Sequence, residues 1–285
     1  MEIRAALASF VAFALCCGLA AQEDSTAANR TETRTEALAF GAKLWVKNRN
    51  GAILVSGWDK EEVALVAEIH DSDQRRIDLV VQRAGVDLDI EAQFLQSFLP
   101  MPFGFALSPK CRMTLRVPRR LLGYFKTING AISVATVQGY VRCETINGDI
   151  TLGDIQGEVL AQTTNGDVDA KGLHARILGG TANGRITLED VDGRVKMETT
   201  NGSITARNLD GWGEGISLES ANGPIDLELG RATGDILAVN VNGNIRIKVP
   251  GGRVLEQARH RVHVKVPGRG QQIALETTNG NIHVR

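Results

Sequence analysis

Carboxylates have the clearest potential for chemistry in this chain. Asp149 and Asp167 each directly follow an Asn-Gly pair, and Asp169 comes two residues after the second. If the two segments stack, these carboxylates could act as a general acid and base. A β-helix carbohydrate-active enzyme, a polysaccharide lyase or hydrolase, is therefore the alternative function. No His, Lys or nucleophile recurs beside the carboxylates, so solvated surface residues are the favoured interpretation.

Metal and cofactor chemistry finds little support in the spacing of the remaining polar residues. His260 and His263 are three apart, so on a strand they point to opposite faces, and His283 lies near the chain end. Asp follows only two of the eight Asn-Gly pairs between residues 129 and 280, which is too few for a ladder of calcium sites. No phosphate-binding loop or nucleophile elbow is present. We expect no catalytic, cofactor-binding or metal-binding residues.

A basic stretch offers a possible contact for an anionic partner. Residues 92–143 contain no Asp or Glu, and the formal net charge of the whole chain is only -1. An envelope phospholipid or acidic polysaccharide could use this stretch, although a solvated face that pairs with the acidic middle of the chain is favoured. The whole-chain charge argues against nucleic acid. The candidate patch consists of Lys110, Arg112, Arg116, Arg119, Arg120 and Lys126.

The element that must position these residues is a repeat marked by Asn-Gly. From Asn129 onward the first five pairs are evenly spaced along the sequence, and three more follow at wider spacing. Such a constant period is typical of stacked repeats. In the turns, Asn can take the left-handed conformation and stack as a ladder of side-chain amides. The predicted turn ladder is Asn129, Asn147, Asn165, Asn183, Asn201, Asn222, Asn242 and Asn279.

Each repeat unit alternates apolar and polar positions, as a strand with one buried face does. Ile186 and Leu188 follow one Asn-Gly pair in this way, and a second Gly turn follows half a period later. A meander of hairpins and a parallel solenoid could both use the pattern. Like residues recur after a full period and not after half of one, which favours the solenoid. The predicted fold is all-β: a parallel β-solenoid with two-strand coils of about 18 residues.

The N-terminus resembles an export signal. Residues 5–20 are apolar and uncharged, and the run is shorter than a membrane-spanning helix requires. We expect a signal peptide over residues 1–20 and a secreted, periplasmic or cell-surface protein. An uncleaved anchor is a less favoured alternative. A lipoprotein using Cys16 or Cys17 is also less favoured, because neither residue follows a small side chain.

The rest of the chain divides into three predicted parts. A polar linker covers residues 21–37, a β-rich region covers 38–127 and caps the solenoid, and the solenoid repeats cover 128–285. Four of the eight Phe lie between Phe94 and Phe105, in a long excursion that either folds over the core or contacts a partner.

Two further features concern the pairing of the last strand with another chain and the pairing of two cysteines. The final strand, Asn281 to Arg285, is expected to be exposed and could accept another chain edge to edge. Cys111 and Cys143 lie at apolar-facing positions. Buried free thiols are favoured there, and a disulfide between them remains open.

Three motifs together carry a family resemblance. They are Gly-Ala-Ile-Leu-Val-Ser-Gly-Trp-Asp at 51–59, Val117-Pro118 before Thr-Ile-Asn-Gly at 127–130, and the run of Thr-x-Asn-Gly units. The chain resembles the bacterial putative-adhesin family of β-strand-repeat proteins, a domain of unknown function. The resemblance implies an exported all-β repeat protein and supplies no catalytic residues. We expect a non-enzymatic binding or scaffold protein of the cell envelope, whose partner is an unidentified polysaccharide, lipid or protein.

Overall fold

The computed structural model describes residues 30–285 except 72–74, 97–107, 211–214 and 269. Over this part of the chain every regular element is a β-strand, and no helix long and apolar enough to cross a bilayer occurs. The predicted signal peptide and most of the Phe-rich excursion lie outside the described residues. The strands of the N-terminal part are β1 (Arg30–Ala37), β2 (Lys43–Lys47), β3 (Ile53–Trp58), β4 (Glu62–His70), β5 (Arg75–Ala84), β6 (Asp87–Gln96), β7 (Lys110–Pro118) and β8 (Arg120–Lys126).

The repeats form the remaining strands. These are β9 (Ile132–Ala135), β10 (Gln138–Glu144), β11 (Ile150–Gly153), β12 (Gln156–Asn165), β13 (Val168–Asn183), β14 (Ile186–Asp192), β15 (Val195–Asn201), β16 (Ile204–Asp210), β17 (Ile216–Asn222), β18 (Ile225–Leu229), β19 (Gly234–Asn242), β20 (Ile245–Ile247), β21 (Arg253–Ala258), β22 (Arg261–Val266), β23 (Gln271–Asn279) and β24 (Ile282–Val284).

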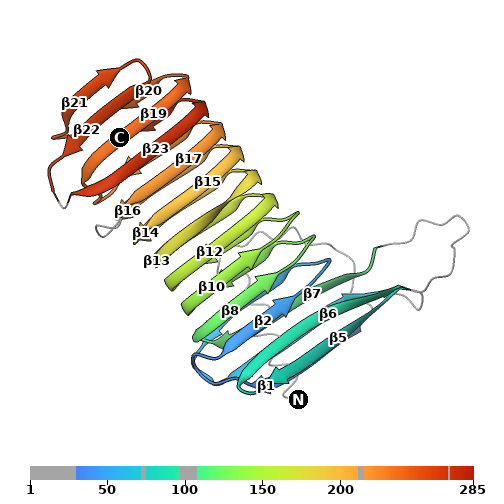
Figure 1. Cartoon of the computed structure of the whole chain (residues 1–285). Helices are drawn as coiled ribbons and strands as arrows, with labels where there is room; N and C mark the ends of the chain where they lie inside the picture. Colours follow the sequence, from blue (N-terminus) through green and yellow to red (C-terminus); the bar gives the residue numbers. More distant parts are fainter. Residues whose placement is uncertain (1–29, 72–74, 97–107, 211–214, 269) are drawn as a thin grey trace, which may run out of the picture.

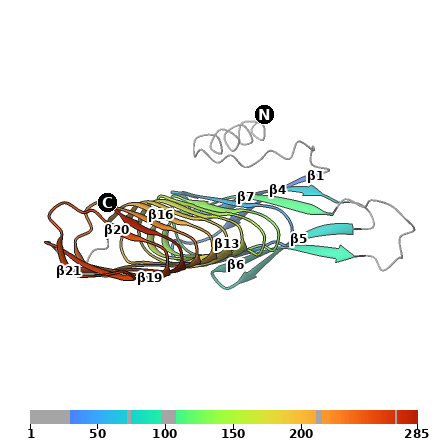
Figure 2. The ribbon, with the colours of Figure 1, turned by 90° about the horizontal axis from the view of Figure 1, so that it is seen from above.

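The strands build two layers that enclose one elongated core (Figures 1 and 2). Sheet 1 has the spatial order β5-β6-β2-β8-β10-β12-β13-β15-β17-β23-β19-β22-β21. Sheet 2 has the order β1-β4-β7-β3-β9-β11-β13-β14-β16-β18-β24-β20. The long strand β13 contributes to both sheets. All pairings between repeat coils are parallel, which confirms the predicted solenoid.

The register confirms the predicted coil length. Val141 lies opposite Val159, and Ile177 lies opposite Val195, so identical coil positions stack. The inward side chains are aliphatic and fully buried, as Ile150 and Ile186 illustrate at 0% exposure. Neighbouring coils therefore share one continuous core, and no coil buries its apolar face alone.

The left-handed residues occur in the second turn of each coil. Thr136, Asp154, Asp190 and Asn208 have φ between 50° and 61°, and they share one coil position. None of the eight ladder Asn residues has a positive φ, so the predicted left-handed Asn conformation is wrong. The reason is that Asn129, Asn147 and their neighbours form parallel bridges from coil to coil, which keeps their backbone extended.

The N-terminal strands extend both sheets. The segment from β2 through Asn50-Gly51 to β3 stacks on the coil formed by β8 and β9, and Asn50 bridges to Asn129. Residues 30–37, expected to belong to a polar linker, instead form β1 against β4. Its alternation of Thr with Arg and Glu suits a strand with one free edge.

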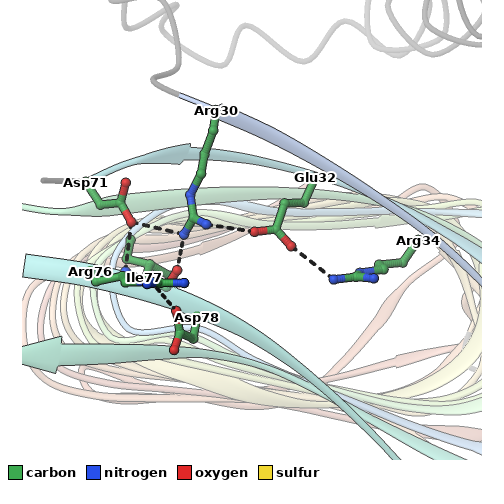
Figure 3. Close-up of polar contacts among 7 residues, drawn as sticks. All are labelled: Arg30, Glu32, Arg34, Asp71, Arg76, Ile77 and Asp78. Carbon is green, nitrogen blue, oxygen red and sulfur yellow. Dashed lines mark hydrogen bonds and ion pairs between the residues drawn. The ribbon is translucent and has the colours of Figure 1, made fainter. Parts of the chain in front are cut away.

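A polar network joins the two sheets at this end (Figure 3). The guanidinium of Arg30 on β1 lies 3.0 Å from Asp71 and 2.9 Å from Glu32, and it also donates to the carbonyl of Ile77 on β5. Asp71 in turn accepts the backbone N–H of Ile77 at 2.9 Å. Arg30 therefore ties the free edge of sheet 2 to the free edge of sheet 1.

The chain folds back on itself at the other end. β23 lies between β17 and β19, and β24 lies between β18 and β20. The last strand of the sequence is thus paired along both edges, and the expectation that residues 281–285 form an exposed edge is wrong. The segment can insert because it repeats the coil signature, with Thr277 and Asn279 matching Ser220 and Asn222.

The two cysteines of the folded region are free and buried. Cys111 lies on β7 of sheet 2 and Cys143 on β10 of sheet 1, so the alternative of a disulfide is wrong. Burial, with a smaller contribution from Glu32, raises the pKa of the Cys111 thiol to about 12. Burial also raises the pKa of Cys143. Both residues behave as small apolar core side chains.

Candidate binding surface

The predicted turn residues form one continuous ladder of amides. Asn129 accepts at one end of the ladder, and each of the other Asn side chains donates its Nδ2–H to the Oδ1 of the neighbouring Asn, at donor–acceptor distances of 2.8 or 2.9 Å. The ladder follows space and not sequence, since Asn279 stands between Asn222 and Asn242. Buried Thr residues support it from inside: the hydroxyl of Thr145 donates to the carbonyl of Gly130 at 3.0 Å, and later coils repeat this bond. These Asn residues hold the coils together.

The carboxylates that could do acid–base chemistry also bond from coil to coil. Asp149 accepts the backbone N–H of Asp167 at 2.8 Å, and Asp167 accepts that of Arg185 at 2.6 Å. Asp169 lies close by, and its pKa is raised first by burial and further by Asp167 and Asp149. The structure thus brings the three carboxylates together and gives two of them a structural role.

His260, His263 and His283, considered above as metal ligands, each contact a different residue. His260 contacts Asn240 at 3.1 Å, and His263 and His283 face Asp235 and Asp226 at 3.5 and 3.8 Å. Over the described part of the chain, no group of three or more His, Cys, Asp or Glu side chains is placed to hold a metal ion.

The six residues of the basic patch do not share one surface. Arg112 and Arg116 point outward from β7 in sheet 2, whereas Lys126 points outward from β8 in sheet 1. Lys126 pairs with Glu144 at 3.1 Å. Arg119 pairs with Asp59 at 3.2 Å in the connection between the sheets. Lys110 and Arg120 are exposed at the starts of β7 and β8. The fold therefore divides the positive charge between two opposite faces.

A groove crosses the outer face of sheet 1. Its volume is about 820 Å³, and it runs over β12, β13, β15, β17, β23 and β19. It is hollow because small residues, among them Gly179, Gly180, Ala182 and Ala221, line it. Gly180 interrupts an outward row in which the neighbouring coils carry Gln162 and Glu198. A substitution of Gly for a long side chain at one coil position is the sequence signal that could have revealed the groove.

Three carboxylates border the groove on consecutive strands. Glu198, Glu219 and Glu276 lie opposite one another in the register of β15, β17 and β23. Lys196 pairs with Glu198 at 2.9 Å. The hydrogen bond and charge of Glu198, followed by the charge of Glu219, raise the pKa of this lysine.

Aromatic side chains continue this face toward the N-terminal end. Trp45 on β2 and Tyr124 on β8 stack with ring centroids 5.4 Å apart, and Tyr140 on β10 lies 5.5 Å from Tyr124. Both Tyr residues of the chain take part. The register joins stack and groove in one outward row across six strands: Trp45, Tyr124, Arg142, Leu160, Leu178 and Lys196.

Comparison with known proteins places this architecture in a family. The family model described as Toastrack DUF4097 matches residues 53–285. The chain belongs to the Toastrack DUF4097 family. This membership confirms the resemblance seen in the sequence, because the matched family is an all-β repeat family that is a domain of unknown function. No curated protein is significantly similar to this Toastrack chain in sequence.

Two crystal structures resemble the Toastrack chain. One is a putative adhesin from Bacteroides fragilis NCTC 9343, with 14% identity and a TM-score of 0.37, and the match covers 91% of this chain and 99% of that one. The other is a putative cell adhesion protein from Clostridium sporogenes ATCC 15579, with 9% identity and a TM-score of 0.25, covering 90% of this chain and 99% of that one. The outward row and the groove of sheet 1 are features of this chain's own side chains.

Proposed function

We propose that this Toastrack protein is exported and acts without catalysis as a binding or scaffold protein of the cell envelope. Export rests on the apolar run before residue 21. The observation that carries the binding function is the outward row of sheet 1 together with its groove. The row and the groove both follow the long axis of the solenoid. Equivalent side-chain positions of neighbouring strands therefore recur along them at intervals of about 4.8 Å.

An extended polymer suits such a surface better than a compact ligand. A polymer with a repeating unit can use equivalent contacts on successive coils, and each contact adds to the others. The groove offers hydroxyl and carboxylate groups, and the aromatic stack offers half-buried rings with polar tips. These groups suit the hydroxyls and apolar ring faces of a polysaccharide. Because Glu198, Glu219 and Glu276 repel anions, a neutral or amine-bearing polysaccharide fits the groove.

Binding is tested with purified envelope polysaccharides and titration calorimetry. We expect saturable binding that Tyr124→Ala weakens by about tenfold, since an aromatic contact contributes about 1 kcal/mol or more. Glu219→Ala should also weaken it. The matched control is Glu228→Ala, which removes an exposed carboxylate from the opposite sheet and should leave affinity unchanged. Equal affinity in all three variants would contradict the assigned surface.

The same preparation tests export and the absence of catalysis. Mass spectrometry should find a mature N-terminus near residue 21, whereas a retained Met1 would contradict removal of the signal peptide. Incubation with the bound polysaccharide should release no new chain ends. Product release would instead favour the alternative of a carbohydrate-active enzyme.

A further inference from the structure

We propose that the edge strand β21 at the C-terminal end pairs with β21 of a second copy of this chain to form a twofold-symmetric dimer. This surface is separate from the groove and goes beyond the proposed function. β21 is the last strand of sheet 1 at this end (Figure 1). Within the described residues it pairs only with β22, so one row of its backbone N–H and C=O groups faces solvent.

The strand is also uncovered on its faces. All six of its residues are exposed, including Val254 at 54% and Leu255 at 47%. Val254 lies opposite Val264, whose side chain faces the core and is 3% exposed. The core-facing side of sheet 1 therefore continues into β21, beyond the short strand β20 that ends sheet 2. An apolar surface continuous with the core gains most from burial against another chain.

The register of β21 with β22 sets the direction of its charged side chains. Arg253 lies opposite Lys265, and Glu256 lies opposite His263. Lys265 and His263 are two residues apart and share the outward face, so Arg253 and Glu256 share it too. This arrangement arises because Leu255 is an extra residue, at which the register shifts.

The strand is complementary to itself. In antiparallel pairing with the twofold axis between Val254 and Leu255, Arg253 of one copy faces Glu256 of the other. Val254 of one copy then faces Leu255 of the other. Both copies carry the extra residue at the centre, so it does not shift the register between them. Opposite charges at the two flanking positions and apolar side chains at the centre of the strand identify a second copy as the occupant.

The other free edges are less suited to this role. β20 has three residues, β1 alternates Thr with Arg and Glu, and β5 is contacted at the Ile77 carbonyl by Arg30 of β1. Because the β21 contact is isologous, it closes after two copies and produces dimers instead of fibres.

Sedimentation velocity of the protein in the form that the cell produces tests the pairing over a wide range of concentration. The wild type should shift from monomer to dimer as concentration rises. Arg253→Glu places two carboxylates opposite each other twice in the dimer, and Glu256→Arg does the same with two guanidinium groups. Each variant should weaken self-association at least about tenfold. Thermal melting controls for folding: Arg253→Glu should leave it unchanged, and Glu256→Arg should shift it only slightly, because the pair that it removes, Glu256 with Arg261 at 3.1 Å, is exposed.

A mixture of the two variants provides the decisive arm. In a heterodimer of Arg253→Glu with Glu256→Arg, both cross-strand pairs regain opposite charges, so dimerisation should return to the wild-type level. The double variant should also dimerise on its own. A monomeric wild type at all concentrations, single variants that dimerise normally, or a mixture that fails to dimerise would each overturn the proposal.

Discussion

The two ends of the solenoid finish the same sheet in opposite ways. Each end of sheet 1 is an antiparallel hairpin, β5 with β6 at one end and β21 with β22 at the other. On β5, Ile77 is 0% exposed, whereas on β21 Val254 is 54% exposed. Both ends of sheet 1 carry an antiparallel hairpin, so the hairpin itself does not decide whether an end is closed.

The opposite sheet makes the difference. At the N-terminal end, sheet 2 continues through β4 and β1, and Arg30 of β1 bonds across to β5 (Figure 3). At the C-terminal end, sheet 2 stops at the three residues of β20. A solenoid end is therefore closed when both layers reach it and polar side chains join them, and the open end is the one available for association.

The largest expected effect comes from removing residues 271–285. These residues form the coil that lies inside the stack although it is last in the sequence, and Ile273, Leu275, Ile282 and Val284 are all at most 1% exposed. Their loss should cost on the order of 10 kcal/mol, which matches the stability of a typical domain. Hydrogen exchange should show lost protection in β17 to β20 and retained protection in β9 to β12. Full protection of β17 and β18 would mean that the inserted coil is dispensable.

A smaller loss of stability is expected from a single substitution in the inserted coil, and a substitution in the open edge strand β21 serves as its control. Leu275→Ala should lower the free energy of unfolding by about 2–5 kcal/mol, because it leaves a cavity in the core. The control, Val254→Ala on β21, should change it by less than about 0.5 kcal/mol in the monomer. Denaturant unfolding measures both values. Equal losses would show that β21 is covered in the folded monomer.

The smallest effect concerns the closed end. Arg30→Met removes the guanidinium that joins β1 to β5 and should cost about 1–2 kcal/mol, because Asp71 and the Ile77 carbonyl lose a charged donor. Arg34→Met is the matched control, since Arg34 lies 3.4 Å from Glu32 on its own strand and is 54% exposed. Thermal melting should distinguish the two variants. A control as destabilised as Arg30→Met would contradict the role of the network.

The sequence predicted local features well because each has a local cause. The regular spacing of the Asn-Gly pairs indicated which residues stack, and in the next three coils the positions of Thr145 and Asn147 again hold Thr and Asn. Alternation around Ile186 indicated the buried face. The left-handed residues were misplaced because a turn motif alone does not show which backbone groups bond to the next coil.

The candidate site was less predictable than the fold. The groove depends on outward side chains from strands far apart in sequence, such as Glu219 and Glu276, which adjoin only because β23 inserts beside β17. The basic patch failed to form one surface for a related reason. Its residues are near in sequence, but β7 and β8 belong to different sheets, so Arg116 and Lys126 face opposite directions.

The sequence by itself determined the strands, the period of the coil and the parallel stacking, because these depend on alternation and spacing within one repeat. It did not determine the order in which the coils stack. Coils with the same Thr, Asn and aliphatic positions are interchangeable neighbours, so the segment at 271–285 matches the coil of β17 and β18 as well as the coil of β19 and β20. Only the tertiary structure chose between these neighbours. The hairpin of β21 and β22 occupies the outer edge of β19 and leaves the inner edge to the returning chain.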